Sequence, residues 1–119
     1  MKLVNKSRNL EIAGRVSVAD DFFTRAVGRL GTSSFEAGTC LWIRASWLAP
    51  CNSVHTFFMR YAIDVVFVDK SLSVKAVYRE LKPWRMTKPA SGAVDAFELP
   101  GGTLRSFPVE VGDQLHVGD

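Results

Sequence analysis

The chain has 119 residues, a net charge of +3 and a sequence pI of about 9.1, and 47% of its residues are hydrophobic. That apolar content excludes a wholly disordered chain, and the length predicts a single domain over residues 1–119. The basic residues are spread along the chain and are densest over residues 75–88, so the charge permits nucleic-acid binding but does not favour it.

The first residues do not resemble a targeting segment. Residues 1–13 carry Lys2, Lys6, Arg8 and Glu11 and lack the apolar run of a secretory signal. No apolar stretch reaches the roughly 20 residues of a membrane helix, and the two cysteines are too few for a disulfide framework. We therefore expect a cytoplasmic protein with reduced thiols and no membrane contact.

The first third of the chain predicts short strands followed by one helix. Residues 9–18 alternate loosely between apolar and polar side chains, as a strand does. Ser17 and Asp20 then resemble a helix N-cap and its acidic first turn, and Gly31 supplies a stop. The apolar residues between them fall at helical spacing, namely Phe22, Phe23, Ala26, Val27 and Leu30. This pattern predicts an amphipathic helix packed on a core.

From residue 39 onward the pattern is that of strands. Residues 39–47 are β-prone, and residues 54–59 and 62–69 are the most apolar runs. Because residues 62–69 are apolar at both odd and even positions, we expect a central strand buried on both faces, with residues 72–80 as its hairpin partner. Further strands are expected at residues 94–99, 107–111 and 114–117, with a turn at Pro100, Gly101 and Gly102.

Many short strands with frequent turns and a single helix define the fold class. We expect an α+β fold that is mostly β: a compact antiparallel or mixed sheet, or a partly open barrel, with one short amphipathic helix.

The segment from Lys82 to Gly92 is predicted to be a long exposed loop. It holds two prolines, which deny it hydrogen-bond donors for a sheet, and Trp84 lies beside Arg85 and Lys88. An exposed aromatic next to basic residues is typical of recognition surfaces. The partner is unknown, and a protein contacting this loop is our expectation.

One run in the middle of the chain resembles a known family. Residues 54–69 read Val-His-Thr-Phe-Phe-Met-Arg-Tyr-Ala-Ile-Asp-Val-Val-Phe-Val-Asp, with His55, Thr56, Met59, Ile63, Asp64, Phe67 and Asp69 at matching steps. They resemble the family known as domain of unknown function 192, and the resemblance covers about residues 10–117. It implies a small, mostly β fold and brings no activity with it.

His55 and Asp64 are the residues most suggestive of chemistry, since both interrupt apolar strands. A buried imidazole or carboxylate there needs hydrogen-bond partners. His55 is either a core histidine bonded to a carbonyl or to Asp64, or a residue that contacts a ligand or transfers protons. Asp64 either bonds to backbone amides or pairs with Arg60 or Arg44, or else orients His55. We expect Asp64 to be buried and close to His55.

Cysteine and histidine also suggest a metal site or a nucleophile. Cys51 and His55 are four residues apart, but their spacing, with Cys40 and His116 elsewhere, matches no compact ligand motif. A Cys51 nucleophile with His55 as its base remains an alternative. We expect no metal and no cofactor.

Glu98 is a second acidic residue in an apolar strand. A pair of Glu98 with Asp64 would suit acid–base chemistry, but nothing in the sequence places the two residues together. The residues expected to contact a ligand are His55, Thr56, Met59, Asp64, Trp84 and Glu98. Because no complete set of nucleophile, base and acid is evident, the favoured function is a non-catalytic binding or accessory module. The alternatives are a small hydrolase or transferase using His55 and Asp64, and a weak nucleic-acid-binding domain.

Overall fold

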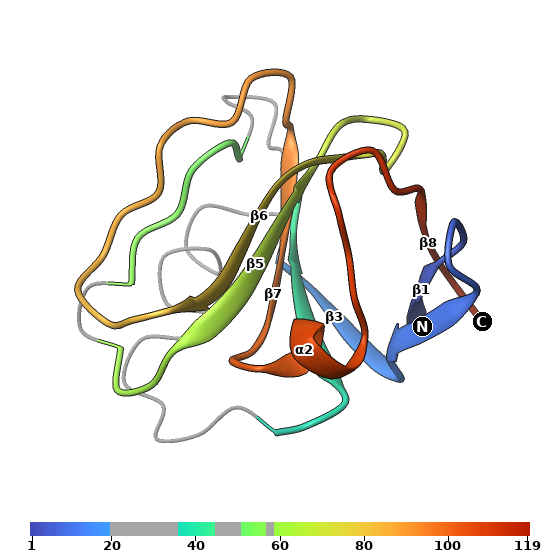
Figure 1. The fold of residues 1–119 in the computed structure, drawn as a ribbon, viewed down its shortest axis with the longest axis horizontal. Helices are drawn as coiled ribbons and strands as arrows, with labels where there is room; N and C mark the ends of the chain where they lie inside the picture. The colour runs from blue at the N-terminus through green and yellow to red at the C-terminus, as the bar shows by residue number, and fades with distance from the viewer. Residues whose placement is uncertain (20–35, 45–50, 57–58) are drawn as a thin grey trace.

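The computed structural model describes residues 1–19, 36–44, 51–56 and 59–119. Within these residues, eight strands form two sheets, and there is one short helix (Figure 1). In chain order the elements are β1 (Lys2–Asn5), β2 (Leu10–Ala13), β3 (Arg15–Ala19), β4 (Thr39–Ile43), β5 (Ile63–Val68), β6 (Val74–Leu81), β7 (Asp95–Pro100), α2 (Thr103–Ser106) and β8 (Leu115–Gly118). The predicted mostly β fold is confirmed, and neither sheet closes into a barrel.

The larger sheet has the strand order β3-β4-β7-β5-β6. Only β3 and β4 pair in parallel, and the other neighbours are antiparallel, so this is a mixed sheet. Strand β5 lies between β7 and β6, and all six of its residues are buried. The prediction of a central strand with a hairpin partner is therefore confirmed.

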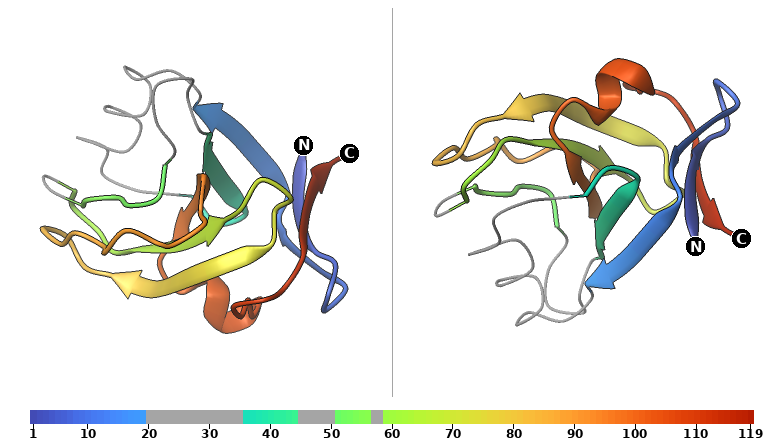
Figure 2. Two further views of the ribbon diagram at one scale, coloured as in Figure 1. Left: turned by 90° about the horizontal axis from the view of Figure 1, so that it is seen from above. Right: turned by 90° about the horizontal axis from the view of Figure 1, so that it is seen from below.

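The smaller sheet brings the two ends of the chain together. Its order is β2-β1-β8, with antiparallel pairing throughout. The N and C termini lie side by side in both views of Figure 2, and the amino group of Met1 is 3.3 Å from a carboxylate oxygen of Asp119. The strand predicted at residues 114–117 corresponds to β8, which pairs with β1 and lies outside the larger sheet.

Apolar side chains form one cluster on each face of the larger sheet. Val66 and Val68 of β5 belong to the first cluster, which the smaller sheet and α2 also enter through Leu3, Leu115 and Leu104. The alternate β5 residues Ile63, Val65 and Phe67 belong to the second cluster. Successive side chains of a strand point to opposite faces, so a strand covered on both sides must be apolar throughout.

Three local expectations differ from the structure. Ser17, expected to cap a helix, lies in β3 opposite Leu41, so no helix begins there, while residues 20–35 of that prediction lie outside the described part. Residues 107–111 form no strand, and β8 begins only at Leu115. The turn at residues 100–102 is present, but it leads into α2, a helical turn too short to show a periodic pattern.

The described residues contain no helix with the length and apolar character required to cross a membrane.

Candidate functional site

The predicted loop after β6 lies against a second segment of the chain. Residues 51–56 run antiparallel to residues 84–94, and Figure 1 shows the two as neighbouring green and orange traces. The amide of Thr87 donates to the carbonyl of Val54 at 2.9 Å, and that of Ala90 donates to Asn52 at 2.8 Å. His55 and Met86 form an antiparallel bridge. Backbone hydrogen bonds to residues 51–56 therefore hold the loop along much of its length.

Thr56 is the residue that fixes the start of this loop. Its side chain is fully buried, and its hydroxyl donates to the carbonyl of Lys82 at 2.7 Å and accepts from the amide of Arg85 at 2.8 Å. Its backbone amide donates to the carbonyl of Arg85 at 2.8 Å, and its carbonyl accepts from the amide of Trp84 at 2.9 Å. One buried threonine thus holds the turn over residues 82–85.

Trp84 is held in an unfavourable backbone conformation at the tip of that turn. Its φ is 64°, in the left-handed region that bulky side chains rarely adopt. Its side chain is nevertheless 56% exposed, and that of Met86 is 65% exposed. His55 is also exposed on the neighbouring segment. We call the exposed side chains of His55, Trp84, Arg85, Met86 and Lys88 the Trp84 surface.

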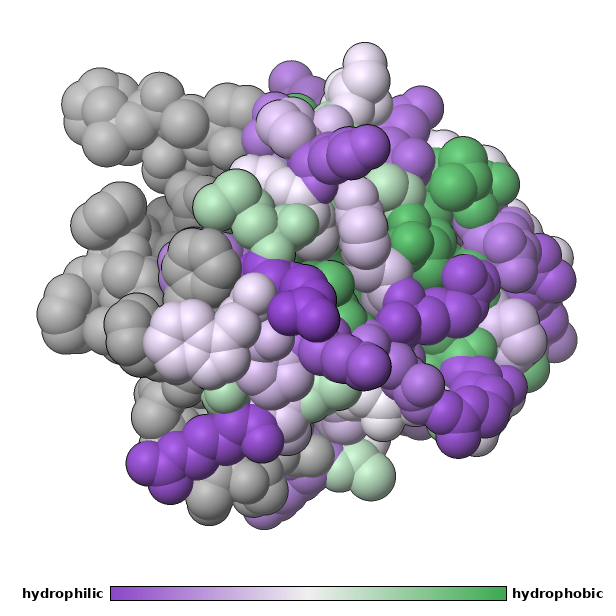
Figure 3. Space-filling view, turned by 60° about the vertical axis from the view of Figure 1, so that its left-hand side comes forward, coloured by the Kyte–Doolittle hydropathy of each residue, from purple (hydrophilic) through white to green (hydrophobic). Residues whose placement is uncertain are grey.

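The Trp84 surface is basic and lacks acidic neighbours in its own loop. Lys82, Arg85 and Lys88 are exposed, and none makes an ion pair within the part of the chain that the structure describes. Viewed from the side of this loop, hydrophilic side chains lie across the face with paler and apolar ones between them (Figure 3). The surface therefore combines apolar area with positive charge.

Asp64 has a different environment. Its carboxylate is fully buried, as expected, and accepts three backbone hydrogen bonds. Oδ1 accepts from the amides of Glu80 at 2.6 Å and Gly102 at 3.2 Å, and Oδ2 accepts from the amide of Leu104 at 2.8 Å. It therefore satisfies the irregular end of β6 and the first turn of α2. This is the structural role weighed for Asp64, and all three of these partners are backbone amides.

Asp64 and Glu98 point to opposite faces of the larger sheet. Asp64 pairs with Leu99 across β5 and β7, whereas Glu98 pairs with Val65 and, on the other side, with Leu41. The side chains of Leu41 and Val65 belong to the second cluster, so Glu98 shares their face, where it is nearly buried. The two residues therefore do not form a carboxylate pair, because the strand alternation places them on opposite faces of the sheet.

The two cysteines and His55 differ in burial. Cys40 and Cys51 are buried on opposite faces of the sheet, whereas His55 is exposed. No group of three or more His, Cys, Asp or Glu residues in the described ranges is arranged to hold a metal ion. The expected absence of metal and cofactor remains a prediction.

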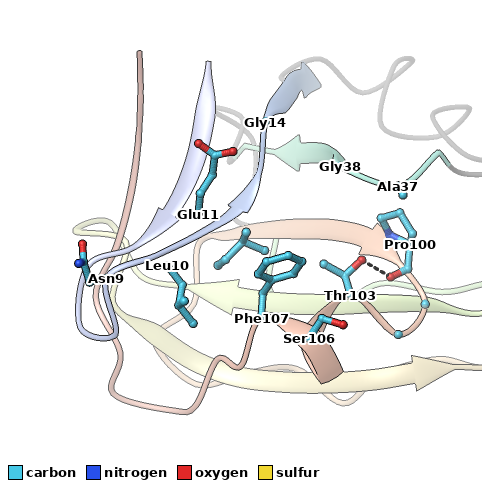
Figure 4. A pocket seen from close by; sticks show the side chains of 13 residues that line it. Asn9, Leu10, Glu11, Gly14, Ala37, Gly38, Pro100, Thr103, Ser106 and Phe107 are labelled. Carbon is cyan, nitrogen blue, oxygen red and sulfur yellow. Dashed lines mark hydrogen bonds between the residues drawn. The ribbon is translucent and has the colours of Figure 1, made fainter.

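A separate groove of about 890 Å³ lies between β2 and α2 (Figure 4). Phe107 lies between Leu10 and Thr103 in this groove, and Glu11 projects from the β2 side. Glycine forms much of the remaining lining, at positions 14, 38, 101 and 102. The sequence does not indicate this groove, because its lining comes from distant segments that carry no shared pattern.

Thr87 and Glu80 are further residues that sequence reasoning missed. Thr87 is buried, and its hydroxyl accepts from the amide of Val54 at 2.9 Å. Glu80 adopts a φ of 52° at an irregularity of β6, where the register with β5 shifts. Neither shows a signal in the sequence, because threonine and glutamate are ordinary in loops and strands.

Comparison with solved structures identifies the same fold in two proteins. A putative transcription regulator from Sinorhizobium meliloti has a TM-score of 0.74 at 15% identity, covering 97% of this chain and 89% of the other. A protein of unknown function from Novosphingobium aromaticivorans has a TM-score of 0.80 at 15% identity, covering 98% and 82%. At this identity the likeness concerns the fold alone.

Sequence comparison gives closer relatives. The UPF0127 protein of Thermococcus sibiricus is 35% identical over 113 residues, which cover 95% of this chain and 72% of the relative. The UPF0127 protein of Pyrococcus horikoshii is 36% identical over 113 residues, covering 95% and 96%. The profile of the family DUF192, described as "Uncharacterized ACR, COG1430", matches residues 3–117. The chain therefore belongs to the DUF192 family.

Proposed function

We propose that this protein is a non-catalytic binding module whose contact region is the Trp84 surface. The observation that carries the proposal is a large aromatic side chain that is 56% exposed and held at φ 64° by a buried threonine. A left-handed conformation of a non-glycine residue costs about 1–3 kcal/mol and persists where the surrounding structure enforces it, often at functional sites. Exposed tryptophan is also enriched where proteins bind partners.

Under this proposal, only some of the residues predicted to contact a ligand belong to the contact region. His55 and Trp84 belong to the contact region, and Thr56 supports it from below. Met59 and Glu98 lie on the second-cluster face of the sheet, and Asp64 supports α2. Since the carboxylate of Asp64 is bonded to backbone amides, a hydrolase or transferase built on His55 and Asp64 is the weaker alternative. We expect the binding to take place in the cytoplasm.

Selection from a displayed library of random peptides tests the proposal. We expect peptides that bind the wild-type protein and bind Trp84→Ala at least about tenfold more weakly. Phe107→Ala is the matched control, because Phe107 is the exposed aromatic of the separate groove. Peptides that depend on Phe107 and ignore Trp84 would move the binding site to the groove, and the absence of any Trp84-dependent ligand would refute the proposal.

Thermal and chemical unfolding distinguish a contact residue from a lid. Trp84→Ala should change the free energy of unfolding by less than about 0.5 kcal/mol, as exposed substitutions usually do. Trp42 is the control, because it stacks on Phe97 at 5.4 Å and donates to Asp95 at 3.0 Å. Trp42→Ala should cost about 3 kcal/mol. A similar loss for Trp84→Ala would mean that Trp84 covers the core instead of contacting a partner.

A further inference from the structure

We infer that the partner of the Trp84 surface is an acidic protein segment that carries an apolar anchor side chain. This inference rests on the proposed function and names the chemistry of its partner.

The first support is the distribution of ion pairs. Every carboxylate side chain in the described residues is either ion-paired or buried. The ion pairs between side chains are Lys2–Glu11, Arg8–Asp113, Arg15–Glu36, Lys75–Asp69, Arg79–Glu110 and Arg105–Glu80. Lys82, Arg85 and Lys88 have no such partner in the described part. Within the described residues, the positive charge around Trp84 is therefore not neutralised. A partner with complementary negative charge would gain favourable electrostatic energy by binding there.

The second support is the exposed apolar area in the same loop as those charges. Trp84 and Met86 are 56% and 65% exposed, and both residue types are enriched at protein interfaces. Methionine adapts its shape to an incoming side chain, while tryptophan offers a rigid face. An acidic segment without an apolar residue would leave this area in water. The partner therefore needs both negative charge and a side chain such as leucine or phenylalanine.

A nucleic acid is the competing occupant, and the described surface favours it less. Binding of a single strand requires several aromatic platforms along a continuous basic groove. Within the described residues, Trp84 is the only aromatic side chain of the Lys82–Gly92 loop, and its exposed neighbour is methionine. The net charge of the chain is also only +3. An oligonucleotide is accordingly included in the test as an alternative outcome.

Fluorescence anisotropy with labelled synthetic probes tests the inference. The first probe is a short peptide of glutamate and aspartate containing one leucine and one phenylalanine. The second replaces the acidic residues with glutamine and asparagine, the third replaces the apolar residues with serine, and the fourth is oligothymidylate. We expect the first probe to bind at least about tenfold more tightly than each of the others at low salt, and less tightly as salt rises.

Two charge-reversed variants locate the binding. Arg85→Glu combined with Lys88→Glu should weaken the first probe at least about tenfold. Lys2→Glu combined with Lys6→Glu changes the net charge equally on the far side of the molecule, and it should weaken binding less than about threefold. Figure 1 shows that residues 1–6 lie away from the orange loop. Circular dichroism of both variants establishes that they are folded.

The outcomes separate this inference from the proposed function. Equal binding of the acidic and amide peptides, equal effects of the two charge-reversed variants, or tighter binding of oligothymidylate would each overturn the acidic partner. If peptides selected from the random library depend on Trp84 but are not acidic, the proposed function stands and this inference fails. If no peptide depends on Trp84, both fail.

Discussion

Two buried polar residues, Thr56 and Asp64, perform the same task in different parts of the molecule. Each interrupts an apolar segment, and each hydrogen-bonds to backbone groups near a residue with positive φ. Thr56 holds the turn that contains Trp84, and Asp64 binds the amide of Glu80. Buried polar atoms and irregular backbone are each unfavourable alone, and they offset one another here because each supplies the other's hydrogen bonds.

Removing the hydroxyl of Thr56 should destabilise the protein more than shortening its side chain. Thr56→Val keeps the shape but leaves the carbonyl of Lys82 and the amide of Arg85 without that partner, which should cost about 2–4 kcal/mol. Thr56→Ser retains the hydroxyl and should cost about 1 kcal/mol. Equilibrium unfolding in urea measures both. Equal losses would mean that the methyl group, and not the hydroxyl, stabilises the loop.

Replacing Asp64 by asparagine, which has nearly the same shape, should already destabilise the protein. In Asp64→Asn one oxygen becomes an NH₂ group, which cannot accept from the amide of Leu104 or from those of Glu80 and Gly102. We expect a loss of about 2–4 kcal/mol in the free energy of unfolding.

The matched control for Asp64 is Asp69→Asn. Both backbone hydrogen bonds of Asp69, from Ser71 and Ser73 at 2.9 Å, reach the same oxygen, so an asparagine can retain them. This variant should lose less than about 1 kcal/mol. Similar losses in both variants would indicate that charge, rather than the number of accepting atoms, decides the stability.

At the scale of the elements, sequence patterns were sufficient to predict a hairpin but not its irregularities. The hairpin of β5 and β6 was predictable, because β5 is apolar at every position and residues 72–80 alternate. The register shift within that hairpin was not, because the positive φ falls on Glu80 instead of a glycine. The burial of Asp64 followed from its apolar neighbours, but its partners did not, since they come from residues 80, 102 and 104.

The turn between β7 and α2 requires a glycine at position 101. A Cβ atom there would lie 2.8 Å from the carbonyl oxygen of Ala62, and a backbone atom cannot move aside cheaply. Gly101→Ala should therefore cost about 1–3 kcal/mol. Gly14→Ala is the control, because its Cβ would meet only the side chain of Glu11, at 3.6 Å. Unfolding curves that coincide for the two variants would contradict the assignment.

At the scale of the whole molecule, strand positions were more predictable than strand partners. Nothing in the sequence indicates that β3 pairs in parallel with β4, or that β8 leaves the main sheet to pair with β1. Such pairings depend on contacts between residues far apart in the chain, which local alternation does not encode. Local alternation likewise did not indicate the partners of Asp64, which accepts from the amides of residues 80, 102 and 104.

Acid should weaken the link between the two ends of the chain. Burial raises the pKa of Asp113, but hydrogen bonds from Asn5, Arg8 and the amide of Glu110 outweigh it, so the pKa lies below 3.8. A carboxylate with a lowered pKa in the folded state stabilises the fold above its unfolded pKa, and this contribution is lost as the pH falls through the folded pKa. We expect the free energy of unfolding to fall as the pH drops below about 4.

Asp113→Asn identifies the contribution of this group to the acid sensitivity. The variant should be less stable than the wild type near neutral pH, and the difference between the two should shrink as the pH falls. Urea unfolding at a series of pH values measures both. A constant difference over that range would show that protonation of Asp113 has no part in it.

The pairing of β1 with β8 makes the chain almost circular. Lys2 lies opposite Gly118 and Leu3 opposite Val117, and the termini form an ion pair. A short linker could therefore join residues 1 and 119 without disturbing any strand, and the ring could be reopened at a surface turn elsewhere. Reopened at the turn between β5 and β6, the same fold would begin with β6 and the Lys82–Gly92 loop. A protein rearranged in this way would carry its Trp84 surface close to its new N-terminus, ready for fusion or attachment to a support.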